Sequence, residues 1–435
     1  MTELQDEPRL KGAQRPRTAA RVAAVQALFQ IDQNGDRPEN VIEQFLVHRF
    51  GTTLDGASYE DGCIPEADTQ LSLFIKLPRL LYDDLPSYVP PLDMEQRDIF
   101  SPTHAPFFEH GFACYFLAWR NGKPIGRISA QIDALALKQP GPRTGFFGAL
   151  DTLEPECVAP LLEAATQWLK LRKVERIRGP WTLNSNGESG IMVEGQDEPP
   201  MIGIPWHPKI LGPAVEAAGF KRAVDLLSYR METSPSAERA NQIPANIRQR
   251  LGAITMRGLR KDKVNEDAEI LREIYNDAWS DTWGNIPLTQ DEVKSLLKAL
   301  KPILRPEQYV LAEVAGEPAA IALVIPNMFD ISGDLGGAPS PLGWLKLASR
   351  VVSHDFRSAR VVLLGVRKKY LGTALRAMLP ALIIDELMKR GHVLPYRSIE
   401  LGWVLETHEG LRKLIERISP TPYKRHRMYE KLLTD

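Results

Sequence analysis

Cysteine is scarce in this chain of 435 residues. Cys63, Cys114 and Cys157 are the only three, and no two of them have CxxC spacing. An odd and widely spaced set does not form a disulfide framework or supply a structural zinc site. We therefore expect a protein of a reducing compartment that binds no metal.

Neither sign of charge is in excess, and long apolar runs are missing. Lysine and arginine total 54 against 55 acidic residues, so any anion must be bound by a local patch. No run of 18 apolar residues occurs, and the amino-terminal "MTELQDEPRLKGAQRPRTAAR" lacks the apolar core of a signal peptide. We expect a cytoplasmic location, with contact at most at the inner face of the membrane.

The chain also lacks the residue orders typical of nucleophilic catalysis. No Cys-His or Ser-His-Asp arrangement stands out, and no metal-ligand spacing is visible. The composition is that of a globular protein, with 43% hydrophobic and 25% charged residues. Its length predicts two or three domains.

The first 70 residues differ from the rest. Five basic residues and no acid lie between Arg9 and Arg21, and short helical patterns follow. From residue 71 strands and helices alternate: "ACYFLAWRNGKPIGRISAQID" (113–133) predicts a hairpin around Asn121-Gly122, and residues 158–171 have a helical period. The polar stretch 233–250 predicts a linker.

Three short segments recur in the same order in both parts of the chain. "LAWRNGKPIGRI" from Leu117 aligns with "LAEVAGEPAAIA" from Leu311, "PWTLNSNG" (180–187) with "GWVLETHE" (402–409), and "FKRAVDLLSYRM" (220–231) with "YKRHRMYEK" (423–431). The shared order predicts a tandem duplication of one αβ unit.

Four segments connect this repeat to a known family: "FIKLPRLLYDDLPSYVPPL" (74–92), "FFEHGFACYFLAWRNGKPIGRI" (107–128), "IYNDAWSDTWGNIPLT" (274–289) and "YKRHRMYEK". They resemble the GNAT-like family that includes bacterial ceramide synthases and YghO-type proteins. The resemblance implies an α/β (α+β) fold with tandem GNAT-like domains at 71–232 and 251–435. It also implies transfer of an acyl group from acyl-CoA to an amine, with a sphingoid base as a candidate acceptor. A non-catalytic binding or scaffold protein of the same fold is the alternative.

The amino-terminal arm has a different resemblance. "RTAARVAAVQALFQIDQNG" and "ENVIEQFLVHRFG" are similar to the start of the transcription antitermination factor NusB, whose arginine-rich end binds RNA. The resemblance implies phosphate contacts for Arg15, Arg17 and Arg21. Because the later helices of the NusB bundle are absent, residues 1–70 are expected to be an incomplete NusB-like helical arm, and RNA binding by residues 9–21 is not expected. An RNA-associated protein that acts through this arm is a further alternative.

A turn in the second half is the candidate coenzyme A site. In a GNAT domain the fourth strand ends in the pattern R/Q-x-x-G-x-G/A, whose backbone amides face the pyrophosphate at the start of a helix. In "LLGVRKKYLGTALRAML" (363–379) the pattern positions are taken by Leu371, Ala374 and Arg376, and Pro380 falls within the following helix. The resemblance implies a cofactor site made of Val366, Arg367, Lys368, Gly372, Thr373 and Ala374. The alternative is a plain strand-to-helix connection with solvated lysines. The first half has acids at the corresponding "GFFGALDTLEPE", and we expect no coenzyme A there.

Two glutamates are the candidate catalytic residues. Glu400 and Glu406 flank "SIELGWVLE", and strand alternation predicts that they share a face, where either could act as general base. The alternative for each is a solvated or salt-bridged carboxylate. His408 lies where GNAT domains often carry an asparagine that contacts the cofactor, and it could equally be a surface histidine.

Further residues are candidates for substrate binding. Asn184, Asn186 and Glu188 lie in the turn-rich "WTLNSNGESGIMVEG", which could also be an ordinary turn. Trp279 and Trp283, four residues apart, could line a lipid slot or pack in the core. The apolar and basic segment "SPLGWLKLASRVVS" (340–353) predicts either a helix in a membrane interface or one that covers a sheet edge.

Overall fold

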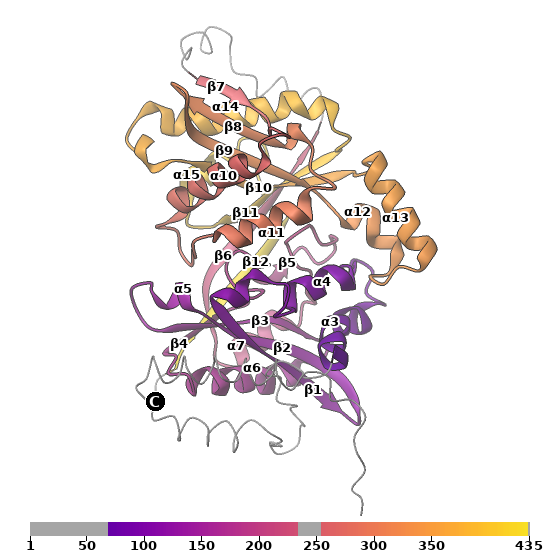
Figure 1. Ribbon diagram of the computed structural model, residues 1–435. Coiled ribbons are helices and arrows are strands. Elements are labelled where there is room, and N and C mark those ends of the chain that lie inside the picture. The colour runs from indigo at the N-terminus through magenta and orange to yellow at the C-terminus, as the bar shows by residue number, and fades with distance from the viewer. Residues whose placement is uncertain (1–67, 234–253, 434–435) are drawn as a thin grey trace, which may run out of the picture.

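The computed structural model describes residues 68–233 and 254–433. Residues 1–67 of the NusB-like arm, including Arg15, Arg17 and Arg21, and nearly all of the expected linker lie outside these ranges, whereas residues 68–70 begin the first described helix. The described chain forms two αβ halves joined by one twisted sheet (Figure 1).

The first half contains five helices, one short 3₁₀ helix and six strands. Its helices are α3 (Asp68–Tyr82), α4 (Asp93–Phe100), η1 (Pro106–Glu109), α5 (Ala134–Leu137), α6 (Pro155–Lys170) and α7 (Leu211–Ala217). Its strands are β1 (Gly111–Arg120), β2 (Lys123–Asp133), β3 (Thr144–Thr152), β4 (Arg176–Gly179), β5 (Ile191–Glu194) and β6 (Lys221–Glu232).

The second half repeats this order with longer insertions. Its helices are α10 (Val264–Trp279), α11 (Gln290–Leu300), α12 (Phe329–Ser332), α13 (Pro341–Ser353), α14 (Ala374–Arg390) and α15 (Glu409–Ile415), with 3₁₀ helices η2 (Pro306–Gln308), η3 (Gly333–Leu335), η4 (Lys368–Tyr370) and η5 (Gly391–Val393). Its strands are β7 (Ile254–Arg257), β8 (Tyr309–Val314), β9 (Glu317–Pro326), β10 (Ser358–Val366), β11 (Ser398–Leu405) and β12 (Lys424–Leu432).

Equivalent tight turns close the β1–β2 and β8–β9 hairpins. Asn121 and Gly122 have φ of 51° and 73°, and Ala315 and Gly316 have φ of 52° and 82°. Two successive positive φ angles are the condition for a type I′ hairpin turn. The predicted hairpin is confirmed, and its aligned counterpart in the second half adopts the same geometry.

Helices cover both faces of the sheet in each half. In the second half, Leu311, Ile321 and Leu323 pack with α10, whereas the alternate residues Val310 and Ala322 pack with α14. In the first half, α6 covers one face of the β1–β2 hairpin and α3 the other. The period of two along each strand therefore fills two core layers per half.

The halves exchange their last strands. The sheet order is β1-β2-β3-β4-β12-β6-β11-β10-β9-β8-β7, and β5 pairs with β12 beside this path. The last strand of the second half, β12, pairs with β4 of the first half, while β6 of the first half pairs with β11 of the second. Figure 1 shows the yellow β12 running down into the first half. Neither sheet is complete without a strand from the other half.

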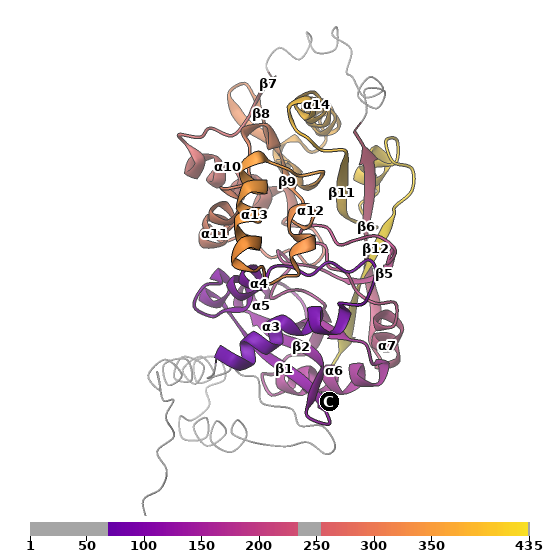
Figure 2. The same cartoon turned by 90° about the vertical axis from the view of Figure 1, so that its right-hand side faces the viewer.

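Helices α12 and α13 project from the side of the second half, as Figures 1 and 2 show. Among the described residues, no helix is long and apolar enough to span a bilayer.

Candidate functional site

Two parallel strands of the second half separate partway along their length. β10 and β11 pair only along one short stretch, in which Ser358–Val361 of β10 lies beside Ser398–Leu401 of β11. Beyond this point β10 continues along β9, and β11 continues along β6. The strands therefore leave a gap in the middle of the sheet.

A cavity of about 780 Å³ occupies this region. Its wall includes Leu363 and Leu364 of β10, Trp403 of β11, and residues of both α10 and α14. Because these helices lie on opposite faces of the sheet, the cavity reaches both faces through the gap. Most of its lining is apolar, which suits a hydrophobic ligand.

The equivalent place in the first half is filled. β3 and β4 also pair in parallel, from Thr144 to Phe146. A Cβ on Gly148 would lie only 1.8 Å from the carbonyl oxygen of Trp181, which also accepts a hydrogen bond of 2.7 Å from Gln131. The Gln131 side chain and the Trp181 backbone thus fill, in the first half, the space that is open in the second half.

Glu188 is the carboxylate with the most unusual environment in the cavity wall. It lies on the loop after β4, and the Thr182 hydroxyl donates to it at 3.5 Å. Burial raises the pKa of Glu188 to about 7, and the nearby charge of Glu95 acts in the same direction. Such a group changes its protonation state near neutral pH, as a general base must.

The two asparagines of this loop have different positions. Asn184 is buried and is absent from the cavity lining; its amide donates to Glu292 at 2.8 Å, and its oxygen accepts from the Asn186 backbone at 3.0 Å. Asn186 lines the cavity and accepts a hydrogen bond of 2.8 Å from Tyr275. Asn184 therefore shapes the loop, whereas Asn186 can contact a ligand.

Trp279 and Trp283 both line the cavity. Trp279 is the last residue of α10, so their spacing of four does not correspond to a helical turn. Trp279 stacks on Tyr275 at 5.0 Å between ring centroids, and the Arg178 guanidinium lies 4.4 Å from the Trp283 ring centroid.

The predicted common face of Glu400 and Glu406 is wrong. The β11–β6 register shifts between Leu401 and Val404, and Glu406 lies beyond the end of β11. Strand alternation cannot be continued across such an irregularity. Neither carboxylate belongs to the cavity lining.

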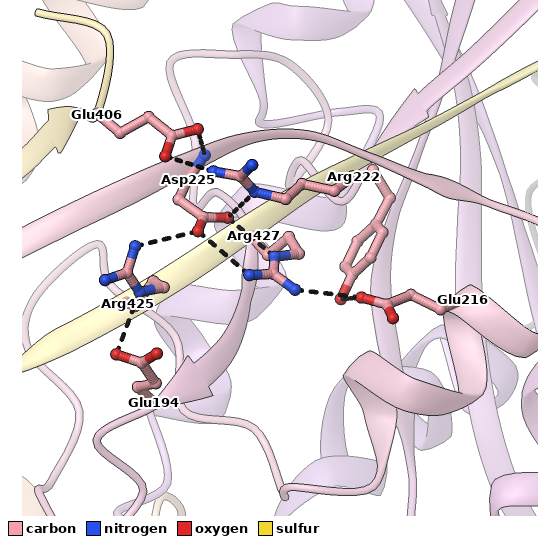
Figure 3. Close-up of polar contacts among 8 residues, drawn as sticks. Glu194, Glu216, Arg222, Asp225, Glu406, Arg425 and Arg427 are labelled. Atoms are coloured by element: carbon pink, nitrogen blue, oxygen red, sulfur yellow. Dashed lines mark hydrogen bonds and ion pairs between the residues drawn. The ribbon is translucent and has the colours of Figure 1, made fainter.

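Both glutamates have protein partners instead. Glu400 is buried, accepts a hydrogen bond from the Tyr423 hydroxyl, and lies 3.6 Å from the Lys424 ammonium. Glu406 pairs with Arg222 and accepts from the Asp225 amide at 3.1 Å. Figure 3 shows Glu406 at the edge of a network in which Asp225 is surrounded by Arg222, Arg425 and Arg427. The catalytic roles of Glu400 and Glu406 stay predictions.

The basic turn after β10 is already neutralised by carboxylates. Arg367 pairs with Glu273 at 2.7 Å, Lys368 with Asp281, and Lys369 with Glu317. Asp277 accepts a hydrogen bond of 2.6 Å from the Lys368 amide. The anion contacts left in this turn are therefore mainly backbone groups.

The backbone of the turn retains an open approach. Gly372 has a φ of 77°, and a Cβ there would meet no atom within 4 Å. Thr373 precedes α14 and makes no side-chain cap; in the first helical turn the Arg376 amide donates to the Thr373 carbonyl at 3.2 Å, which leaves the Ala374 and Leu375 amides as candidates for an anion. Arg376 folds back to donate to the Val366 carbonyl at 3.1 Å, and α14 continues through Pro380.

The turn does not line the cavity. None of its candidate cofactor residues, Val366 and Ala374 included, belongs to the cavity lining. His408 does belong to it, and it caps α15 by accepting a hydrogen bond from the Leu411 amide.

Arg360 and Glu95 line the cavity but were not predicted from the sequence. Arg360 is buried and donates to the carbonyls of Gly402 and Ile202, each at 2.7 Å. Burial lowers its pKa to about 10, so it still carries a positive charge at neutral pH. Glu95 lies on a polar helix far away in sequence, and no local motif marks it. Within residues 68–233 and 254–433, no cluster of metal-ligating side chains is present.

Comparison with known proteins supports this architecture. No family model matches the chain. It is 35% identical to the bacterial ceramide synthase of Caulobacter vibrioides, over 87% of this chain and all of that protein. It is 34% identical to Protein YghO of Escherichia coli, over 83% of this chain and 92% of YghO. Both resemblances expected from the four sequence segments are confirmed.

A short segment and a solved structure complete the comparison. The transcription antitermination protein NusB of Gluconobacter oxydans is 53% identical over 66 residues, which span 40% of NusB. A tandem GNAT protein from the clavulanic acid biosynthesis pathway superposes with a TM-score of 0.51 over 87% of this chain and 99% of that one, at 12% identity. The expected tandem GNAT fold is confirmed.

Proposed function

The chain belongs to the family of bacterial ceramide synthase and YghO, and we propose that it is an N-acyltransferase that transfers an acyl group from acyl-CoA to a primary amine. The observation that carries this proposal is Glu188, whose pKa of about 7 places a proton acceptor in the wall of a large apolar cavity. The name of the ceramide synthase relative supports the reaction class, since a ceramide is an N-acylated amine.

Glu188 is the general base in this proposal. It accepts one proton from the ammonium form of the amine, and the lone pair freed on nitrogen attacks the thioester carbonyl carbon. An N–C bond forms, the C–S bond breaks, and the sulfur leaves with the electron pair as a thiolate, which takes a second proton from the nitrogen and becomes the free thiol. Arg360 supplies a positive charge at the wall of the same cavity, and such a charge stabilises the oxyanion of the tetrahedral intermediate.

We assign the coenzyme A pyrophosphate to the turn formed by residues 366–376. Gly372 leaves room for close approach, and the amino-terminal end of α14 offers the favourable end of the helix dipole to an anion. Arg367 and Lys368 would contribute by exchanging their carboxylate partners for phosphate. His408, in the cavity wall, would contact the part of the donor that enters the gap.

A long-chain sphingoid base is the proposed acceptor. The apolar cavity has room for an alkyl chain, and Asn186, Trp279 and Trp283 line it. Phe329 and Ser332 of α12 also line it.

Helix α13, which packs on α12, exposes an apolar stripe. Leu342, Leu345 and Val352 are 78%, 68% and 84% exposed on one face, and α13 contains no acid. We propose that this stripe contacts the membrane from which a lipid amine is drawn.

A non-catalytic ligand-binding role is the second candidate. One observation favours it: the Asp277 carboxylate already accepts a hydrogen bond from the Lys368 backbone amide, at the place assigned to phosphate. RNA association through the arm rests on the NusB similarity alone and concerns residues outside the described ranges.

The test combines purified protein, acyl-CoA of several chain lengths and a panel of amines that includes sphinganine. Mass spectrometry should detect an N-acyl product, with one free thiol released per product. Glu188→Gln should slow the formation of both by about 10²- to 10⁴-fold, while Glu156→Gln, at an exposed position, should change neither. Binding of acyl-CoA by calorimetry without any product would instead support the non-catalytic role.

A further inference from the structure

Glu188 also lines a second, smaller cavity. This cavity has a volume of about 70 Å³, and Glu188 belongs to the lining of both cavities. Unlike the large cavity, it is lined by many polar side chains, including Tyr88, Arg127, Asp151 and His207. We call it the polar chamber.

The polar groups of the chamber are held rigidly. Arg127 donates to Asp151 at 2.8 Å and to the Phe74 carbonyl at 2.7 Å, and both side chains of this ion pair are buried. Nδ1 of His207 accepts from the Met192 amide at 3.3 Å, so its proton is on Nε2. Burial lowers the pKa of His207 to about 4 and keeps the ring neutral.

Tyr88 is the unsatisfied member of this group. Its ring packs against Tyr82 and Trp206, but its buried hydroxyl has no hydrogen-bond partner among the described residues. A buried hydroxyl without a partner is uncommon and indicates a bound water or ligand. The chamber is large enough for one or two water molecules and offers each several polar contacts.

The chamber leads from Glu188 toward the surface. The ion pair of Arg79 and Asp93, 3.0 Å apart and partly exposed, lines its other side. The large cavity is less suited to this purpose, because most of its lining is apolar and the substrates occupy it in the proposed reaction.

We propose that the polar chamber is the proton exit of the acyltransferase site. Water held by Tyr88, His207 and the Arg127–Asp151 pair accepts the proton from Glu188 after it has left the amine, and passes it to solvent beside Arg79 and Asp93. This inference rests on the proposed role of Glu188. It also gives the first half, whose own gap is filled, a direct part in the chemistry.

Two substitutions test the exit while leaving Glu188 in place. Tyr88→Phe removes the hydroxyl and keeps the ring, and His207→Asn keeps an acceptor for the Met192 amide and removes Nε2. Each should lower kcat by about three- to tenfold, increase the solvent deuterium isotope effect on kcat, and leave KM for both substrates within twofold. Tyr309→Phe is the matched control, since this buried tyrosine donates to the Asp267 carbonyl at 3.1 Å and neither residue lines either cavity.

The pH profile is the second readout. The charges that act on Glu188 come from Glu95, Arg127 and Asp151, and none of them is altered by these substitutions. The profile of kcat should therefore keep its inflection near pH 7 while its plateau falls. Unchanged kcat and isotope effect in both variants would overturn the proton exit, whereas an active Glu188→Gln enzyme would overturn the proposed base itself.

A third measurement does not depend on activity. A crystal structure of the full chain at high resolution should show ordered water within hydrogen-bond distance of the Tyr88 hydroxyl. A dry chamber would contradict the inference even if the variants failed to fold.

Discussion

The proposed reaction needs the ionised carboxylate of Glu188, but burial in the folded protein disfavours that form. Because burial raises its pKa to about 7, the fraction of ionised base grows as pH rises from 6 to 8. We expect kcat to rise through this range and then level off. Glu188→Gln should lower kcat by about 10²- to 10⁴-fold at pH 8, the usual contribution of a general base. Initial rates of thiol release between pH 5.5 and 9 check both expectations, and a profile without an inflection near 7 would contradict the assignment.

The same residue links stability to pH with a definite sign. Its pKa in the folded protein is about 7, above the ordinary value of 4.5, so folding favours the neutral carboxyl. The contribution of Glu188 to the free energy of unfolding is therefore fully present below pH 4.5 and is lost as pH rises through 7. Glu188→Gln, which stays neutral, should therefore be more stable than the natural chain at pH 8 and about equal to it at pH 4.5. Urea unfolding at both pH values measures this, with Glu156→Gln as the neutral control.

Gly372 tests the phosphate turn. A side chain there would stand in open space, so it would meet incoming phosphate rather than protein. Gly372→Val should raise KM for acyl-CoA by about tenfold and leave KM for the amine unchanged. Gly316→Val is the matched control, since Gly316 also has a positive φ of 82° and open surroundings, but lies in the β8–β9 turn. Equal effects of both substitutions would mean that backbone strain, and not anion binding, is responsible.

At the level of elements, α13 buries Leu347 but exposes an apolar stripe on another side. Replacing Leu342, Leu345 and Val352 by serine should weaken binding to vesicles of anionic phospholipid by about tenfold or more, because each buried leucine or valine contributes about 1.5–3 kcal/mol. Activity on an amine dissolved in detergent should be unaffected. Leu171→Ser, at an equally exposed leucine of the first half, is the control in co-sedimentation. Binding that survives the triple substitution would exclude α13 as the contact.

Local signals predicted the elements better than they predicted the site. The Asn121-Gly122 pair specifies its turn by its own backbone preference, and the 158–171 period corresponds to α6 (Pro155–Lys170). The exchange of β6 and β12 has no such signal, because strand periodicity records which face is buried and not which strand lies alongside. The shift in β11 likewise has no mark in "SIELGWVLE", so alternation misplaced Glu406. Glu188 could be identified as a loop-borne polar group, but its proton affinity depends on Glu95 and on burial by segments far away in sequence.

For the whole molecule, a histidine connects the two halves. Nδ1 of His110 lies 3.1 Å from Asp133, and Nε2 lies 3.6 Å from Glu292 of α11. Burial disfavours its charged form, but the hydrogen bond to Asp133 and the nearby carboxylate of Glu292 raise its pKa to about 9. The stabilisation is present in full below pH 6.5 and is lost as pH rises through 9.

His110→Gln should therefore destabilise the protein by about 1–3 kcal/mol at pH 7 and remove the decline in stability between pH 7 and 9.5. The measurement is chemical unfolding at a series of pH values. Both halves should unfold in one transition in the natural chain, and a variant curve with the same alkaline decline would contradict the role of His110.

The exchanged strands also set the order of events during biosynthesis. The edge of β4 has to wait for β12 (Lys424–Leu432), which is translated after every other strand of the described residues. Most of the first half is translated long before that, yet its part of the sheet cannot close until the second half has been made. A message cut short before β12 would yield a nascent protein with an unpaired edge, a substrate for proteases and chaperones.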